Sequence, residues 1–245
     1  MDSPDKTRAI VLKAIRYGDN SLIVKLLTEQ NGLQSFMVKG AYNKNAKIRA
    51  ALFQPLTFLD VVCAKSRGEL SYLKEAGIEH AYQDIPANIT KNTIVLFVCE
   101  LLSKTIQEAE TDLELFEFVH RALLHLDEMS GNCADFPLRF AIKVSYFLGF
   151  SPNVNTFQPS FVFDLEEGCF RHDSAGCTYF IDNQLSEAFY RICQDDFFEE
   201  CSLKLRNAER RQLLEAVINY YKLHVSGFNE MNSVEILKAV LSANN

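Results

Sequence analysis

The sequence lacks any long uninterrupted run of apolar residues. No stretch approaches the roughly 18 to 20 apolar side chains that a membrane-crossing helix needs. The N-terminal segment MDSPDKTRAI is acidic and polar, whereas a secretory signal peptide is basic and then apolar. We therefore expect no membrane partner and a cytoplasmic location.

The sequence also lacks the paired cysteines of a structural zinc site. Its seven cysteines include no Cys-x-x-Cys pair, although Cys169, His172 and Cys177 fall within nine residues and Cys193 and Cys201 repeat the eight-residue separation. Zinc ligands usually come in pairs two to four residues apart. A metal site stays possible, but buried free thiols explain scattered cysteines in apolar runs better. We expect no cofactor.

Motifs of catalysis are absent as well. The sequence contains neither a GxxxxGK[ST] loop nor a GxGxxG loop. The adjacent carboxylates Glu166-Glu167 and Asp195-Asp196 would point apart on a strand or a helix. No spacing singles out a Cys-His pair, although a thiol enzyme remains an alternative. We expect a protein that is not an enzyme.

What is present is an uneven distribution of charge. Residues 1–80 carry a net charge of +4 and residues 81–245 carry −11, which together make the chain's −7. Such an asymmetry predicts two domains with different partners. Only the basic part would attract phosphates.

The first eighty residues have the pattern of short strands, expected at residues 7–17, 21–29, 33–40, 55–65 and 69–78. Asn31-Gly32 favours a type I′ hairpin turn between the second and third strands. The fourth and fifth strands are joined near Ser66-Arg67-Gly68. Because open strand edges are costly, five short strands favour a barrel, and the longer connection after the third fits an OB-fold.

After Pro86 the apolar period changes from that of a strand to that of a helix. Asn88 and Asp112 are expected to begin the first two helices. Six helices are expected, at residues 90–107, 112–129, 137–150, 182–193, 203–225 and 233–242. The predicted fold class is α+β, with a five-stranded OB barrel in residues 1–82 and a mostly helical domain in residues 83–245. Residues 151–181 are expected to be irregular.

The stretch VKGAYNKNAKIR, residues 38–49, contains four basic residues and no acidic one. We call it the basic loop. One interpretation is a solvated loop; the other is a DNA interface, with Tyr17 and Tyr42 placed to stack on bases. The candidate DNA-binding residues are Lys13, Arg16, Lys39, Lys44, Lys47 and Arg49, and Lys25 would extend the patch.

A second candidate site lies in the third predicted helix, PLRFAIKVSYFLGF. Arg139 and Lys143 are four residues apart and therefore share a helix face. One interpretation is an ordinary amphipathic helix whose charged side-chain ends reach solvent. The other is a site at which the two cations hold the carboxylates of an acidic, hydrophobic peptide.

The order of these segments resembles the bacterial recombination mediator family RecO. The similar features are RAIVLKAIRYGDNSLIVKLLT, then NG, VKGA and the QPL that opens the fourth strand. FVCELLSKT and FLGFSPN extend a fainter resemblance over nearly the whole chain. The resemblance implies an OB-fold followed by a helical domain. It also implies binding of single- and double-stranded DNA and annealing of complementary strands.

The resemblance further implies help in loading RecA onto DNA coated by single-strand-binding protein (SSB), with RecR as a partner. It implies that the acidic, Phe-ended SSB tail docks on the helical domain, at Arg139 and Lys143 by helix position. Many family members carry a four-cysteine zinc site after the LGF helix, but residues 151–177 here keep cysteines without CxxC pairs. The alternative function is a helical protein-interaction adaptor with a structural barrel and no direct DNA role.

Overall fold

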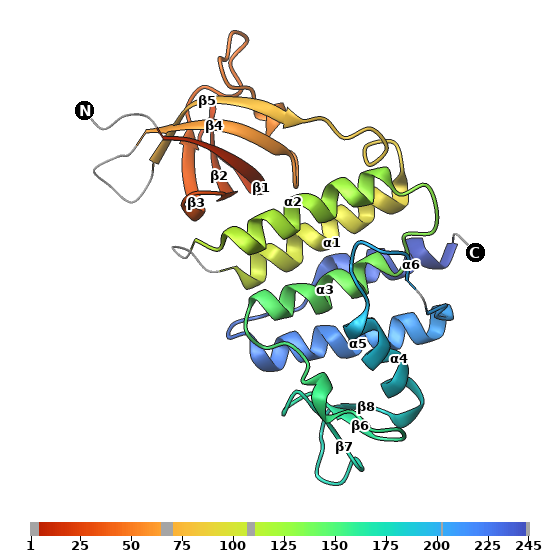
Figure 1. Ribbon diagram of the computed structural model, residues 1–245. Helices are drawn as coiled ribbons and strands as arrows, with labels where there is room; N and C mark the ends of the chain where they lie inside the picture. The colour runs from red at the N-terminus through yellow and green to blue at the C-terminus, as the bar shows by residue number, and fades with distance from the viewer. Residues whose placement is uncertain (1–4, 65–70, 107–110, 202, 244–245) are drawn as a thin grey trace. The chain divides into compact units, whose positions relative to one another are not determined.

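The computed structural model in Figure 1 describes residues 5–64, 71–106, 111–201 and 203–243. They form two compact units. One contains the residues up to 87 together with 102–127, and the other contains 88–101 together with the residues from 128 onward. Compact units need not be continuous in sequence, so the predicted domains 1–82 and 83–245 stay a prediction.

Five strands form a closed barrel in the first unit, coloured red to yellow-orange in Figure 1. Their order around the barrel is β1-β2-β3-β5-β4, in which β3 and β5 run parallel and the other neighbouring pairs are antiparallel. The strands are β1 Asp5–Tyr17, β2 Ser21–Thr28, β3 Gly32–Val38, β4 Phe58–Ala64 and β5 Ser71–His80, with the short 3₁₀ helix η1 Ala50–Leu52 before β4. The predicted five-stranded OB barrel is confirmed.

The inner face of the barrel is apolar because alternate side chains of each strand point inward. Along β2, Leu22, Val24 and Leu26 are buried, whereas Ile23 and Lys25 between them are only partly covered. Complete burial of such a side chain contributes about 1.5 to 3 kcal/mol. Ile23 and Lys25 therefore lie on the outer face of the sheet, outside the barrel core.

The hairpin between β2 and β3 is confirmed, but its predicted turn type is wrong. Three residues separate the strands, and Gly32 has a positive φ of 63° whereas Asn31 does not. A type I′ turn needs two residues of positive φ. The Thr28 hydroxyl stabilises the longer turn, because it donates to the Gly32 carbonyl and accepts from the Asn31 N–H. The predicted connection at residues 66–68 lies outside the described residues.

Two helices follow the barrel in sequence, α1 Ile89–Thr105 and α2 Leu113–Glu128. Both predicted N-caps are confirmed: the Asn88 side chain accepts from the N–H groups of Thr90 and Lys91, and Asp112 accepts from that of Leu115. Near the end of α2, buried Asp127 accepts backbone hydrogen bonds from residues 83, 84 and 85. This carboxylate thereby fixes the chain where it leaves β5.

The second unit contains four further helices, α3 Phe136–Phe147, α4 Asn183–Gln194, α5 Asn207–His224 and α6 Asn232–Ala243. Tyr221 of α5 is fully buried and donates its hydroxyl hydrogen to the Ala141 carbonyl of α3. All six predicted helices are confirmed, with ends that differ by up to four residues. No helix among the described residues is long and apolar enough to span a bilayer.

The expectation that residues 151–181 are irregular is wrong. They contain the 3₁₀ helix η2 Val154–Thr156 and three short strands, β6 Val162–Asp164, β7 Cys169–Arg171 and β8 Phe180–Ile181. The strands form one antiparallel sheet in the order β7-β6-β8, near α4 in Figure 1. Two or three residues are too few to show an alternating pattern in the sequence.

Candidate functional site

The basic loop is anchored to the barrel by its apolar residues. Ala41 and Ile48 are buried in the barrel core, and the Ala50 N–H donates to the Ala41 carbonyl. Gly40 has a positive φ of 67°, and a Cβ atom there would lie 2.9 Å from the Asn43 side-chain nitrogen. These constraints fold the loop tightly, and its four basic side chains, Lys39, Lys44, Lys47 and Arg49, remain exposed.

A groove of about 340 Å³ lies between the basic loop and the start of β5. Lys39 and Lys47 line it, whereas Lys44 and Arg49 are exposed outside its lining. Lys74 of β5 also lines the groove. Sequence reasoning missed Lys74, because the parallel pairing of β3 with β5 that brings it there has no local sequence signal. Met37 and Tyr72 line the groove as well.

Two lysines of the groove, Lys39 and Lys47, make weak contacts. Lys47 Nζ lies 2.9 Å from Glu75 Oε1, and both side chains are mostly exposed. The hydrogen bond from Lys47 lowers the pKa of Glu75. Lys39 Nζ lies 4.6 Å from the ring centroid of Tyr72. Exposed ion pairs and cation–π contacts contribute little, so a phosphate group can compete with both.

Arg16 lies at the same end of the barrel as the basic loop. Its guanidinium carbon is 5.0 Å from the ring centroid of Tyr42, and its Nη2 donates to the Asp19 carbonyl. The predicted neighbourhood of Arg16 and Tyr42 is therefore present. Lys13 precedes Arg16 in β1, and it lies on the outer face directly opposite Lys25 of β2.

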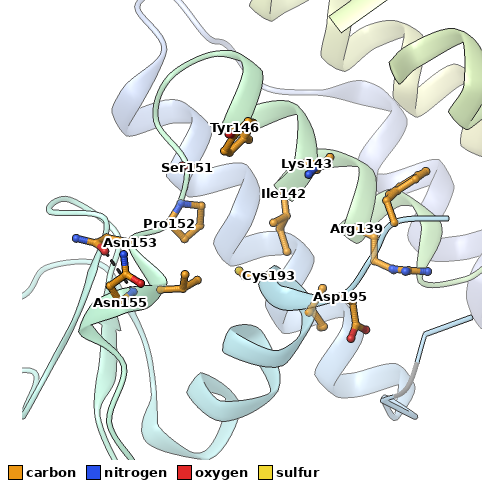
Figure 2. A pocket seen from close by; sticks show the side chains of 13 residues that line it. Arg139, Ile142, Lys143, Tyr146, Ser151, Pro152, Asn153, Asn155, Cys193 and Asp195 are labelled. Carbon is orange, nitrogen blue, oxygen red and sulfur yellow. Dashed lines mark hydrogen bonds between the residues drawn. The ribbon is translucent and has the colours of Figure 1, made fainter. Parts of the chain in front are cut away.

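The second unit contains a pocket of about 520 Å³ beside α3, shown in Figure 2. We call it the α3 pocket. Arg139 and Lys143 both line it, so the structure brings the two predicted residues together. The other lining residues are Ile142, Tyr146, Ser151, Pro152, Asn153, Val154, Asn155, Ile192, Cys193, Asp195 and Phe197. The pocket therefore combines two cations with apolar side chains and one carboxylate.

The two cations differ in what they contact. Arg139 Nη2 donates to the carbonyl oxygens of Asp196 and Glu199, at 2.5 and 3.0 Å, and the guanidinium carbon lies 5.6 Å from the Phe197 ring centroid. Lys143 Nζ lies 5.1 Å from the ring centroid of Tyr146, and no carboxylate of the described residues pairs with it. Arg139 thus builds the wall of the pocket, while Lys143 can meet an incoming anion.

The cysteine chemistry does not favour a nucleophile. Burial raises the pKa of Cys193, in the α3 pocket, and that of Cys201. Burial likewise raises the pKa of Cys169 and of Cys177, and the nearby Asp164 carboxylate adds to the effect. A catalytic thiol instead has a lowered pKa. These four groups are therefore protonated at neutral pH.

The residues at the expected zinc position do not fit a zinc ion. The Cys177 thiol donates to Asp164 Oδ2, and Arg171 Nη1 lies 2.8 Å from the same oxygen and 3.6 Å from the sulfur. A guanidinium cation thus lies among groups that would otherwise be ligands, and zinc requires deprotonated thiols. No cluster of three or more potential ligands occurs in the part of the chain that the structure describes.

Comparisons with known proteins identify relatives over nearly the whole chain. The family models "Recombination protein O N terminal" and "Recombination protein O C terminal" match residues 1–82 and 86–232. Proteins named DNA repair protein RecO are 35% identical in Flavobacterium psychrophilum and 34% in Flavobacterium johnsoniae, each over 97% of this chain and 99% of the relative. The relative of that name in Azobacteroides pseudotrichonymphae is 30% identical, over 96% of this chain and 98% of its own.

Proposed function

The chain belongs to the RecO family of DNA repair proteins, and on this premise we propose that it is a non-enzymatic recombination mediator acting in the cytoplasm. It binds single- and double-stranded DNA and anneals complementary strands. Together with RecR it assists the loading of RecA onto SSB-coated DNA. The absence of nucleotide-binding loops from the sequence and the raised pKa values of four thiols support a role without catalysis.

The observation that carries this proposal is the groove beside the basic loop. Lys39, Lys47 and Lys74 converge there from the basic loop and β5, on a barrel of a type that often binds oligonucleotides. Phosphates carry no base identity, so such contacts give affinity without sequence preference. Screening two polyanions on one protein also lowers the barrier to their pairing, which requires neither ATP nor a metal.

The α3 pocket supports the docking of an SSB tail. An acidic peptide that ends in Phe presents carboxylates and one aromatic ring, and the pocket offers Lys143 beside Ile142 and Phe197. Arg139 joins α3 to the segment after α4 through its bonds to the carbonyls of residues 196 and 199. Asp195 on the lining would repel carboxylates placed near it, so the peptide's acidic groups lie toward Lys143.

The groove separates the basic residues into two sets that can be tested against each other. We expect the triple variant Lys39→Gln, Lys47→Gln, Lys74→Gln to lower the salt slope of single-stranded DNA binding by about 2, because each lost phosphate contact lowers it by about 0.7. The measurement is fluorescence anisotropy of a labelled oligonucleotide at several salt concentrations.

The matched control is Lys44→Gln, Arg49→Gln, which removes exposed charge outside the groove lining. We expect this control to change the slope by clearly less per charge than the triple variant. An unchanged slope in the triple variant would show that the groove is not the DNA interface. Equal losses per charge in the two variants would mean that the whole basic loop, rather than the groove, tracks phosphates.

A further inference from the structure

The small sheet of the second unit has one apolar and one charged face. Residues that pair directly across two strands share a face, so Phe163 and Phe170 lie on the same side. Both rings contact Phe189 of α4. Asp164 and Arg171 belong to the opposite side, because each follows one of those rings in its strand. The face away from α4 therefore contains a carboxylate and a cation.

Asp164 is the centre of a polar cluster on this face. Its side chain is 2% exposed, and Oδ1 accepts from the N–H groups of residues 166 and 167. Oδ2 accepts from Arg171 Nη1 at 2.8 Å and from the Cys177 thiol at 3.2 Å. We call these contacts the Asp164 network. A buried carboxylate is costly unless a cation and hydrogen bonds compensate it, so Arg171 is the charged partner on which the network depends.

Strand β7 is joined to the short helix η2 at both ends of that helix. The Asn153 N–H donates to the Gly168 carbonyl at 2.8 Å, and Asn153 forms a parallel β-bridge with Cys169. The Phe170 N–H donates to Thr156 Oγ1, also at 2.8 Å. The position of η2 therefore follows that of β7.

The η2 segment is one wall of the α3 pocket. Asn153, Val154 and Asn155 all line the pocket. Figure 2 shows Asn153 and Asn155 on the far side of the pocket from Arg139. The width of the pocket thus depends on where β7 places η2.

We propose that Arg171 is a positioning residue for the α3 pocket: its pairing with Asp164 fixes β7, and β7 fixes the η2 wall. A side chain then supplies the cation at the centre of this sheet, so the wall keeps its place without a metal. Arg171 lies outside the lining of the pocket and acts on a bound peptide through the wall rather than by contact. The inference rests on the proposed docking of an acidic peptide and adds a residue that shapes its site.

Two synthetic peptides separate positioning from charge. One is acidic and ends in Phe. The other has the same length and the same ring, but Asn replaces each Asp and its C-terminus is amidated. A displaced wall weakens the binding of both peptides alike, whereas the loss of a distant charge weakens only that of the acidic one.

The variant is Arg171→Met, which removes the cation and keeps an unbranched stem. Arg171 is 42% exposed, so the change leaves no internal cavity. Arg171→Lys is the conservative variant that keeps the cation. The matched control is Arg191→Gln, which removes a cation from α4 outside the pocket lining.

On the full chain at pH 7, Arg171→Met should weaken both peptides by the same factor, about fivefold. Arg171→Lys should keep most of the affinity, and Arg191→Gln should keep all of it. Hydrogen exchange should show that the amides of Asn153 and Phe170 lose protection in Arg171→Met and keep it in Arg171→Lys, because their bonds join η2 to β7. A chelator should change none of these quantities.

Three results would overturn the inference. They are unchanged protection of the two amides in Arg171→Met, weaker binding of the acidic peptide alone, and a loss of peptide affinity in the unaltered protein on chelation. If thermal unfolding shows that Arg171→Met does not fold, Cys177→Ala takes its place, because it removes another donor to the same oxygen. Unchanged protection in that variant would then count against the inference. If the unaltered protein binds neither peptide, the proposed docking fails, while hydrogen exchange still tests the positioning of η2.

Discussion

At the scale of single residues, the sequence groups neighbours along the chain, whereas the fold groups neighbours across strands. The four cations of the basic loop form one set in the sequence, but the groove selects Lys39 and Lys47 from them and adds Lys74 from another strand. Arg139 and Lys143 are equivalent by helix spacing, yet the carbonyls of residues 196 and 199 bind one and not the other. Those carbonyls follow α4, far away in sequence, so no local pattern could indicate them.

This difference predicts a separation of effects in the α3 pocket. Lys143→Gln should weaken binding of an acidic, Phe-ended peptide about tenfold, since a charge-assisted contact contributes about 1.5 to 3 kcal/mol. Arg139→Gln should instead lower the free energy of unfolding by about 1 to 2 kcal/mol, because it removes bonds that hold the loop after α4. Peptide anisotropy and thermal unfolding measure the two quantities.

Arg191→Gln is the matched control for this pair, because Arg191 forms an exposed ion pair with Glu187 on α4 and does not line the pocket. It should leave peptide affinity unchanged and alter stability by less than about 0.5 kcal/mol. Full peptide affinity in Lys143→Gln would exclude Lys143 as the anion contact.

At the scale of elements, long periodic segments were predictable and short ones were not. The barrel strands and the six helices follow from apolar periodicity and from caps such as Asn88 and Asp112. The sheet of β6, β7 and β8 does not follow from periodicity, because its strands are too short to show a pattern and hydrogen bonds of the Asp164 side chain stabilise it. Asp164 is almost fully buried, accepts from the backbone N–H groups of residues 166 and 167, and pairs with Arg171.

The Asp164 network predicts an acid-sensitive sheet. Burial alone would raise the pKa of Asp164, but the hydrogen bonds from Arg171, Cys177 and the backbone together lower it. A carboxyl group whose pKa is lower in the folded state than in the unfolded state stabilises the fold at a pH above its unfolded-state pKa of about 4. This contribution is lost as the pH falls through the lower folded-state pKa. Urea unfolding at pH 7 and at about pH 3 should therefore show a loss of stability in acid.

Asp164→Asn tests the same carboxylate directly. This substitution should lower the free energy of unfolding at pH 7 by about 2 to 3 kcal/mol. On acidification the variant should lose less of its free energy of unfolding than the unaltered protein does, because the titrating group is gone. A chelator should not shift the urea midpoint of either protein, because Arg171 supplies the positive charge beside Asp164. An equal acid loss in both proteins would assign the pH effect to other groups.

At the scale of the whole molecule, composition and segment order were sufficient for the fold class and the family. The charge contrast, +4 against −11, reflects two kinds of site: a cationic groove on the barrel and a mixed pocket beside α3. What the sequence could not supply is the set of long-range pairings that assemble each site. The groove, for example, depends on the parallel pairing of β3 with β5.

Because the groove and the α3 pocket belong to different compact units, we expect their ligands to bind without competition. A saturating acidic, Phe-ended peptide should leave both the affinity and the salt slope of single-stranded DNA binding unchanged, since the slope counts only neutralised phosphates. Lys143→Gln should weaken peptide binding alone, and the Lys39, Lys47, Lys74 triple variant should weaken DNA binding alone. Displacement of DNA by the peptide would instead mean that both anions use the groove. Peptide binding without any DNA binding at low salt would favour a helical adaptor whose barrel is only structural.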